Sequence, residues 1–198
     1  MSNQCKICSG DMSLIVHGAK DYFVKRGESS DFDIAFCSHC KIGFSFPDMS
    51  NDELSEYYPK NFEAYTKKSG VLAALQTMKY KQDLRFIFRH KKKIDSLYEI
   101  GAGRGEFLHI AKKKLGNAAY IEGSEPSSKG VENSNELFGI NLEQGFAEAL
   151  NFKQKYDVIC MRHVLEHIND AKAVLGNIFV NGLTQIKSTI GGNYAQQS

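Results

Sequence analysis

A glycine-rich turn between an expected strand and an expected helix is the feature that most constrains the fold. Residues 97–108 read LYEIGAGRGEFL, with glycines at alternate positions, Gly101, Gly103 and Gly105. The apolar run before them predicts a strand, and EFLHIAKKKLG after them has helical spacing. Glycine has no side chain, so a ligand can approach the backbone closely. The stretch therefore predicts a ligand site where a strand meets a helix.

Strands and helices continue to alternate after this turn. AAYIEGSEP predicts a second strand and SSKGVENSNELFG a helix, INLEQGFAEAL holds a short third strand, and YDVICMRHVLEHI is a fourth strand that breaks into a helix. Strands separated by helices imply a parallel sheet with helices on both faces. We therefore predict an α/β, Rossmann-like domain of about four strands over residues 94–198. Because such sheets normally continue after a fourth strand, we expect C-terminal strands to be missing.

Two CxxC pairs predict a metal-binding module over residues 1–48. Twenty-eight residues separate the pairs, which are Cys5, Cys8, Cys37 and Cys40. Two thiolates on each of two tight turns complete a tetrahedron around zinc, and a closed site of this kind is structural. The β-like run after the second pair is typical of a zinc ribbon. Four free thiols, or His17 or His39 as a substitute ligand, are the alternatives, and Cys160 is expected in the core.

Residues 49–93 predict a helical linker or lid. Ser50 and Glu53 have the spacing of a capping box, in which each side chain satisfies the other residue's backbone. Farther on, apolar residues recur at helical spacing opposite a polar face, at Val71, Leu75, Met78, Tyr80, Leu84 and Ile87. The RHKKK run at 89–93 could attract an anion, or it is a solvated helix end whose cations suit the helix dipole.

Composition excludes several classes of function. Hydrophobic residues make up 42% of the 198 residues, and 25 basic against 23 acidic residues give a net charge of +2. This balance argues against nucleic-acid or membrane binding. The polar start MSNQCKICSG lacks the apolar run of a signal peptide, and we expect a cytoplasmic location.

Two acidic residues indicate which ligand the glycine turn holds. The glycine spacing is GxGxG rather than the dinucleotide pattern GxGxxG, and Glu99 stands two positions before Gly101. A carboxylate there repels phosphate but could hold an ammonium group. Glu125 ends the second strand, twenty residues after Gly105, where an acid can accept hydrogen bonds from both ribose hydroxyls. The alternative for Glu125 is a surface residue at a strand end.

YEIGAGRGEFL, IEGSEPS, GFAEAL and YDVICMRHVLEHI, in this order, resemble the S-adenosylmethionine-binding half of a class I methyltransferase. The upstream cysteine segment is similar to the zinc module of a subgroup of bacterial methyltransferases, several of which methylate sugars, often nucleotide-linked. The resemblance implies S-adenosylmethionine as cofactor, structural zinc, and a small-molecule acceptor such as a nucleotide-sugar.

The resemblance also implies roles for individual residues. The glycine turn would pack against the methionine part of the cofactor and Glu125 would bind the ribose. The loop after the third strand would flank the adenine, and the end of the fourth strand would lie beside the sulfonium. The residues so implied are Glu99, Gly101, Ala102, Gly103 and Gly105 in the turn, Phe146, Ala147 and Glu148 in the loop, and Met161, Arg162 and His163 at the strand end.

A catalytic base is predicted in HVLEHI. The candidates are His163, Glu166 and His167, and the spacing of four between the histidines places them on one face of a helix. They could act as a base or hold a divalent metal, or Glu166 and His167 could be structural parts of a helix start. A tyrosine-rich cluster could line a substrate cleft or pack in the core, at Tyr57, Tyr58, Phe62 and Tyr65.

These features predict S-adenosylmethionine-dependent methyl transfer to a small molecule, with low turnover because later strands are missing. The alternative is a zinc-ribbon module for protein or nucleic-acid interaction, followed by a vestigial methyltransferase remnant. A basic, aromatic-studded face would favour the alternative, but SNDELSEYY beside the ribbon is acidic.

Overall fold

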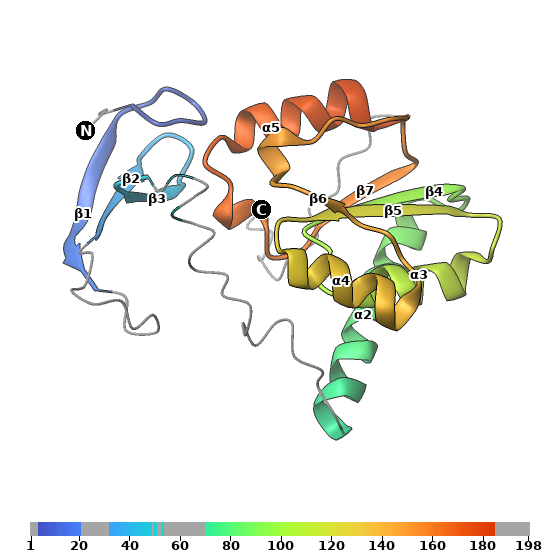
Figure 1. Cartoon of the computed structure of the whole chain (residues 1–198). Coiled ribbons are helices and arrows are strands. Elements are labelled where there is room, and N and C mark those ends of the chain that lie inside the picture. Colours follow the sequence, from blue (N-terminus) through green and yellow to red (C-terminus); the bar gives the residue numbers. More distant parts are fainter. Residues whose placement is uncertain (1–3, 21–31, 49, 51–52, 54–69, 185–198) are drawn as a thin grey trace. The chain divides into compact units, whose positions relative to one another are not determined.

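The computed structural model describes residues 4–20, 32–48, 50, 53 and 70–184 (Figure 1). The chain forms two compact units, one of residues 1–59 with 169–174 and one of residues 60–168 with 175–198. The predicted domain boundaries near residues 48 and 93 stay predictions. The tyrosine-rich cluster of the sequence analysis lies outside the described residues, namely Tyr57, Tyr58, Phe62 and Tyr65.

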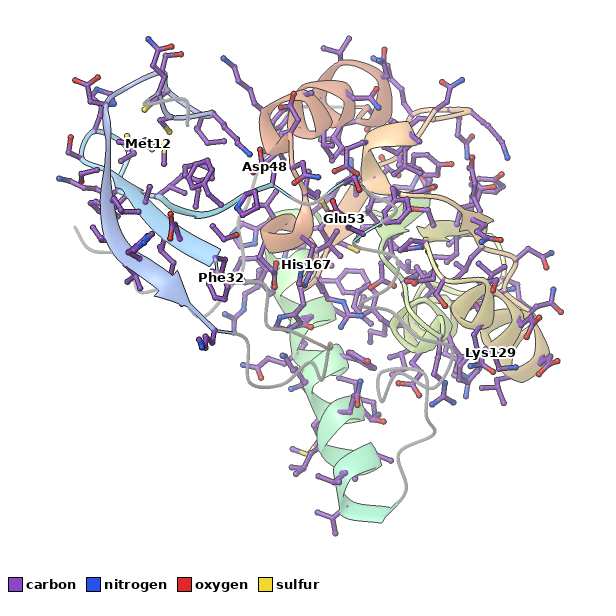
Figure 2. The ribbon with its side chains drawn as sticks, turned by 60° about the vertical axis from the view of Figure 1, so that its left-hand side comes forward. Met12, Phe32, Asp48, Glu53, Lys129 and His167 are labelled. Atoms are coloured by element: carbon purple, nitrogen blue, oxygen red, sulfur yellow. The ribbon has the colours of Figure 1, made fainter. Side chains whose placement is uncertain are left out.

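The first unit contains a three-stranded antiparallel sheet in the order β1-β2-β3, with β1 at Met12–Ala19, β2 at Phe32–Cys37 and β3 at Gly43–Phe46. Met12 pairs with Cys37 and Ala19 with Phe32, so Met12 and Phe32 mark opposite ends of this strand pair (Figure 2). One CxxC turn precedes β1 and the other follows β2. The register therefore brings both cysteine turns to the same end of the sheet.

The predicted capping box is present in the described residues of the same unit. The backbone N–H of Glu53 donates to Ser50 Oγ at 3.3 Å, and the backbone N–H of Ser50 donates to the Glu53 carboxylate at 2.7 Å. Each side chain thus satisfies a backbone donor that has no intrahelical partner.

The second unit contains the predicted parallel sheet. Its strands are β4 (Ser96–Ile100), β5 (Tyr120–Glu125), β6 (Glu143–Gln144) and β7 (Val158–Met161), in the order β6-β5-β4-β7. Helix α3 (Glu106–Leu115) connects β4 to β5, and α4 (Ser128–Phe138) connects β5 to β6. Figure 1 shows α3 and α4 side by side on one face of this sheet. The Rossmann-like prediction is therefore confirmed.

Alternation along β4 divides the interior of this unit into two layers. Leu97 is fully buried in a cluster with Phe107 and Leu108 of α3 and Leu84 of the preceding helix. Tyr98 faces the other way, and its ring lies 5.4 Å from that of Phe152. Glu99, the next residue, has the same orientation as Leu97. It therefore points into the layer beneath α3.

The predicted long helix is α2 (Gly70–His90), but its apolar stripe is only half buried. Tyr80 and Leu84 are buried against α3. Val71, Leu75 and Met78 are 75%, 55% and 66% exposed, so helical spacing at these positions does not mark a core face.

Three short elements and a helix complete the described chain. A 3₁₀ turn (η2, Ala147–Ala149) follows β6, and another (η3, Leu165–His167) follows β7 where a helix start was predicted. Helix α5 (Ala171–Asn177) continues into a π-helical turn, η4 (Ile178–Gly182). Within these described ranges, no helix has the length and apolar character needed to cross a membrane.

Leu97→Ala is expected to lower the free energy of unfolding by about 2–5 kcal/mol, because it leaves a cavity under a central strand. Urea unfolding followed by circular dichroism measures the loss. Leu137→Ala is the matched control, since Leu137 is 45% exposed on α4, and we expect a much smaller change there. Equal losses in the two variants would contradict the position of the core.

Candidate functional site

The strand order of the parallel sheet reverses at β4. From β4 the chain passes to β5 and β6 on one side, and β7 lies on the other side. The carboxyl ends of parallel strands meet at one edge of the sheet, and ligands of such sheets bind where the strand order reverses. The predicted turn and strand-end residues belong to this edge.

The three glycines of the turn after β4 have different roles. A Cβ atom at Gly101 would lie 2.3 Å from Val164 Cγ2, and one at Gly105 would lie 2.2 Å from Ser134 Oγ. A Cβ at Gly103 would have nothing within 4 Å, although its φ of +57° also favours glycine. Gly101 and Gly105 are therefore required by packing within the protein, and Gly103 is where open space meets the backbone.

Glu125 fastens the glycine turn to the end of β5. Its side chain is buried, with Oε2 accepting from the Gly103 backbone N–H at 2.8 Å and Oε1 accepting from the Ser127 N–H at 3.1 Å. Gly130, in the first turn of α4, allows this approach, because a Cβ there would lie 2.7 Å from Glu125 Cγ and 2.8 Å from Gly103 O. Sequence reasoning missed Gly130, and the only available signal was a glycine in the first turn of a helix.

Glu99 is fully buried, and its partner is Arg162 at the end of β7. Arg162 donates from Nη2 and Nε to Oε1 of Glu99, at 2.7 and 2.9 Å. The other oxygen, Oε2, is buried and has no hydrogen-bond partner among the described residues. The sequence placed both residues in the cofactor site, and the structure brings them into contact at the carboxyl ends of β4 and β7.

Helix α2 contributes two residues to this contact that carried no sequence signal. The Arg162 guanidinium carbon lies 4.4 Å from the ring centroids of both Tyr80 and Phe107. Arg162 Nη1 lies 3.7 Å from Asp83 Oδ2. Tyr80 and Asp83 are three apart on α2, so one helix face reaches the end of β7.

The predicted adenine loop lies at the same edge as Glu125. The backbone N–H of Gly145 donates to the Glu125 backbone oxygen at 3.2 Å, and Phe146 and Ala147 follow directly. Ala147 is buried and Phe146 is half-buried. Met161 pairs with Ile100 at the carboxyl ends of β7 and β4. These predicted cofactor contacts thus lie at the same edge of the sheet, and their role stays a prediction.

The prediction that His163 and His167 share a helical face is wrong. His163 has a left-handed φ of +56°, and the 3₁₀ turn that contains His167 (Figure 2) begins only at Leu165. Residues other than glycine rarely adopt this conformation, and those that do cluster at functional sites. His163 does approach Glu166, with Nδ1 and Oε1 3.7 Å apart.

Lys79 of α2 reaches the other side of the His163 ring. Its Nζ lies 3.3 Å from His163 Nε2. A lysine ammonium can only donate, so Nε2 is the acceptor and the ring proton belongs on Nδ1, which faces Glu166. In this tautomer the lone pair of the ring is on Nε2, where it accepts from Lys79.

The first unit holds a separate cluster in which all four predicted cysteines meet. Their sulfur atoms lie within 4.8 Å of one another, with 3.5 Å between Cys5 and Cys40 and between Cys8 and Cys37. Zinc–sulfur bonds of about 2.3 Å in a tetrahedron require sulfurs roughly 3.8 Å apart. The cluster is therefore compatible with zinc. His17 instead contacts Asp33 at 2.8 Å.

Two equivalent turns build this cluster. The residue after each pair, Ser9 or Lys41, has a left-handed φ of 59° or 62° and donates its backbone N–H to the oxygen of Cys5 or Cys37. Packing requires a glycine at position 10 after the first turn, because a Cβ there would lie 3.3 Å from Cys8 Sγ. Gly10 was also missed by sequence reasoning, and a glycine shortly after a CxxC pair was its signal.

The environment of the sulfurs acts in opposite directions on different cysteines. Hydrogen bonding from the Cys40 backbone N–H lowers the pKa of Cys37, against the effect of burial. Burial, together with its cysteine neighbours, raises the pKa of Cys40 to about 12. A divalent cation would remove this conflict, because a thiol that coordinates a metal is deprotonated.

A parallel sheet with a glycine turn and an acid on the adjacent strand, both at its carboxyl edge, is the arrangement of a Rossmann-like domain. The sequence match is more specific. Residues 72–181, more than half of the chain, match the family described as Methyltransferase domain, and the chain belongs to this family. No curated protein matches the chain.

Several solved structures are similar to this chain at low identity. The plantazolicin methyltransferase BpumL, in complex with a pentazolic desmethylPZN analog and SAH, is 18% identical over 67% of this chain and 50% of its own, with a TM-score of 0.49. CalS10, a SAM-bound amino pentose methyltransferase from Micromonospora echinaspora, is 13% identical over 69% and 54%, with a TM-score of 0.48. The chain thus spans about half the length of the structures it matches.

Gly130→Ala is expected to destabilise the second unit by about 1–3 kcal/mol, because the new methyl group meets the Glu125 carboxylate and the Gly103 backbone. Gly176→Ala in α5 is the control, since nothing lies within 4 Å of a Cβ there and alanine favours a helix. Urea unfolding compares the two. A neutral effect of Gly130→Ala would contradict the close packing of α4 on the glycine turn.

Proposed function

We propose that this protein binds S-adenosylmethionine at the carboxyl edge of β4, β5 and β7 and transfers its methyl group to a small molecule. One observation carries the proposal: a buried carboxylate oxygen without a partner, Glu99 Oε2, at the edge where Gly103 leaves open space. A buried acceptor of this kind suits a cationic group, and the α-ammonium of an amino-acid ligand supplies one.

The remaining residues fit the other parts of this cofactor. We infer that the glycine turn, with Ala102, packs against the methionine part and that Glu125 binds the ribose hydroxyls. Phe146 and Ala147 would flank the adenine, and Met161 would lie near the sulfur. Glu125 already accepts two backbone hydrogen bonds, and each carboxylate oxygen can accept a second bond from a hydroxyl.

When bound, S-adenosylmethionine supplies a methyl group on a positively charged sulfur, so the leaving group is already activated. The protein then has to align the acceptor and remove its proton. We infer that His163 is the base, acting through Nε2 when the acceptor takes the place of Lys79 beside it. His167 lies in the 3₁₀ turn that follows His163 and stays a candidate.

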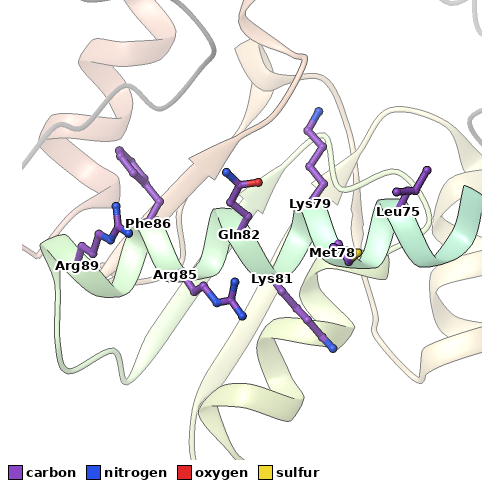
Figure 3. Close-up of a pocket in the computed structure, with 8 residues that line it drawn as sticks. All are labelled: Leu75, Met78, Lys79, Lys81, Gln82, Arg85, Phe86 and Arg89. Atoms are coloured by element: carbon purple, nitrogen blue, oxygen red, sulfur yellow. The ribbon is translucent and has the colours of Figure 1, made fainter.

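The acceptor is proposed to be a sugar or nucleotide-sugar. The sequence resemblance to sugar methyltransferases supports this class. Cationic side chains also line a pocket on the outer face of α2 (Figure 3), beginning at Lys79 beside His163. The others are Lys81, Arg85 and Arg89. This charge would favour an anionic acceptor such as one that carries a diphosphate.

We further propose that the four cysteines hold one structural zinc ion. Four protein ligands leave no open coordination position, so the metal would fold the module rather than take part in methyl transfer.

Glu125→Gln is expected to weaken binding of S-adenosylmethionine about 10- to 100-fold, because a charge-assisted hydrogen bond to the ribose is lost. Isothermal titration calorimetry on the full chain measures this. Glu136→Gln is the control, since Glu136 is exposed on α4. If the wild-type chain does not bind S-adenosylmethionine, the proposed function is wrong.

Cys8→Ser is expected to abolish most zinc binding, because three thiolates and a hydroxyl form a much weaker site. Elemental analysis of protein purified with zinc under reducing conditions should give about one ion per wild-type chain. Cys160→Ser is the control, since Cys160 lies in β7 outside the cluster. If the wild-type protein contains no zinc, or if Cys8→Ser and Cys160→Ser lose zinc equally, the proposal is refuted.

A further inference from the structure

The contact between Glu99 and Arg162 is one-sided. Two nitrogen atoms of Arg162, Nε and Nη2, donate to the same oxygen of Glu99, Oε1. An arginine and a carboxylate usually pair through two parallel bonds that use both oxygens. Here the second oxygen is left without a partner although the Glu99 side chain is completely buried. The pair therefore stabilises the charge of Glu99 and still leaves one acceptor.

Arg162 is held in this one-sided position by two other elements. Tyr80 from α2 and Phe107 from α3 both place their rings 4.4 Å from the guanidinium carbon, which favours a cation there. Asp83 of α2 adds a negative charge 3.7 Å from Nη1. The guanidinium is thus fixed by its surroundings and does not depend on Glu99 alone for its place.

The surroundings of Glu99 would otherwise oppose its ionisation. Burial raises the pKa of Glu99, Arg162 lowers it, and the charges of Glu125 and Asp83 raise it again, so that the pKa remains above its usual value. Arg162 is the one cation among the groups that face this carboxylate in the described structure. Those groups are Arg162 and Cys160 from β7 and its end, Glu125 from β5, and Asp83 from α2.

We propose that Arg162 is a positioning residue that keeps the buried Glu99 ionised, so that Oε2 can receive the ammonium group of an amino-acid ligand. Arg162 itself does not bind this ammonium group. The ligand part of this inference rests on the proposed function. The part that concerns the ionisation of Glu99 does not rest on the proposed function, and it can be tested without any ligand.

The ligand-free test compares the pH dependence of stability in Arg162→Met and in Arg162→Met with Glu99→Gln. Without its cation, Glu99 would be protonated in the folded chain at a pH where it is ionised in the unfolded chain. The folded state then binds more protons, so stability falls as pH rises from the unfolded pKa to the higher folded pKa. The folding equilibrium constant of Arg162→Met should fall by up to about tenfold per pH unit in this window, relative to the double variant.

Arg85→Met is the matched control, because Arg85 is exposed on the outer face of α2 (Figure 3). Its stability should follow wild type across the same pH range, as measured by urea unfolding. If Arg162→Met and the double variant show parallel pH profiles, Arg162 does not control the ionisation of Glu99 and the inference is wrong.

The ligand test compares the binding of two compounds. S-adenosylhomocysteine has the amino-acid part, and 5′-methylthioadenosine lacks it. Arg162→Met should weaken S-adenosylhomocysteine binding at neutral pH by tenfold or more, in line with a lost charge-assisted hydrogen bond. Binding of 5′-methylthioadenosine should change little. Arg162→Lys should restore part of the affinity, because it keeps the charge but not the planar stacking.

Other outcomes have distinct meanings. Tighter S-adenosylhomocysteine binding by Arg162→Met would show that Arg162 competes with the ligand, and equal losses for both ligands would show a purely structural role. Either result overturns the inference. If wild type binds neither compound, the proposed function fails, and the pH profiles alone decide whether Arg162 keeps Glu99 ionised.

Discussion

The buried ion pair between Glu99 and Arg162 is the interaction on which the candidate site depends. A fully buried carboxylate is unfavourable unless a cation and hydrogen bonds compensate for lost water. Arg162 supplies both, and its own position depends on rings from α2 and α3. The strand end of β4, the strand end of β7 and helix α2 are therefore joined through one guanidinium group. The glycine turn lies directly beside this junction.

The two units are stabilised in different ways. The parallel sheet buries a layer of apolar side chains that includes Leu97, Phe107 and Leu108. In the sheet of the first unit and its two cysteine turns, the buried hydrophobic residues among those described are Cys5, Ala35 and Cys37, whereas β1 exposes Leu14, Ile15 and Val16. A small sheet with so little buried apolar surface needs another source of stability. The convergence of four cysteines at one end of that sheet is consistent with a metal in this role.

Local patterns predicted the elements well, but not what each element buries. The strand-turn-helix at residues 96–115 and the cap at Ser50 follow from local chemistry, because glycine turns and capping boxes act within a few residues. Helix α2 was expected from its spacing, yet Leu75 is exposed while Leu84 is buried. Spacing defines a helix face, and only the packing of α3 decides which part of that face is covered. The prediction that His163 and His167 share a helical face failed for a related reason. The backbone after β7 is left-handed at His163, before any helical turn begins.

The sequence alone determined the Rossmann-like order of elements, the four metal-ligating candidates and the acids at the ends of the first two parallel strands. These features depend on short-range periodicity and fixed spacing. Tertiary structure alone decided that Glu99 meets Arg162, that Tyr80 and Asp83 reach the same place from α2, and that Gly103 is the glycine left open. The reason is physical: parallel strands bring residues more than sixty positions apart to one edge, and no local pattern records which of them will touch.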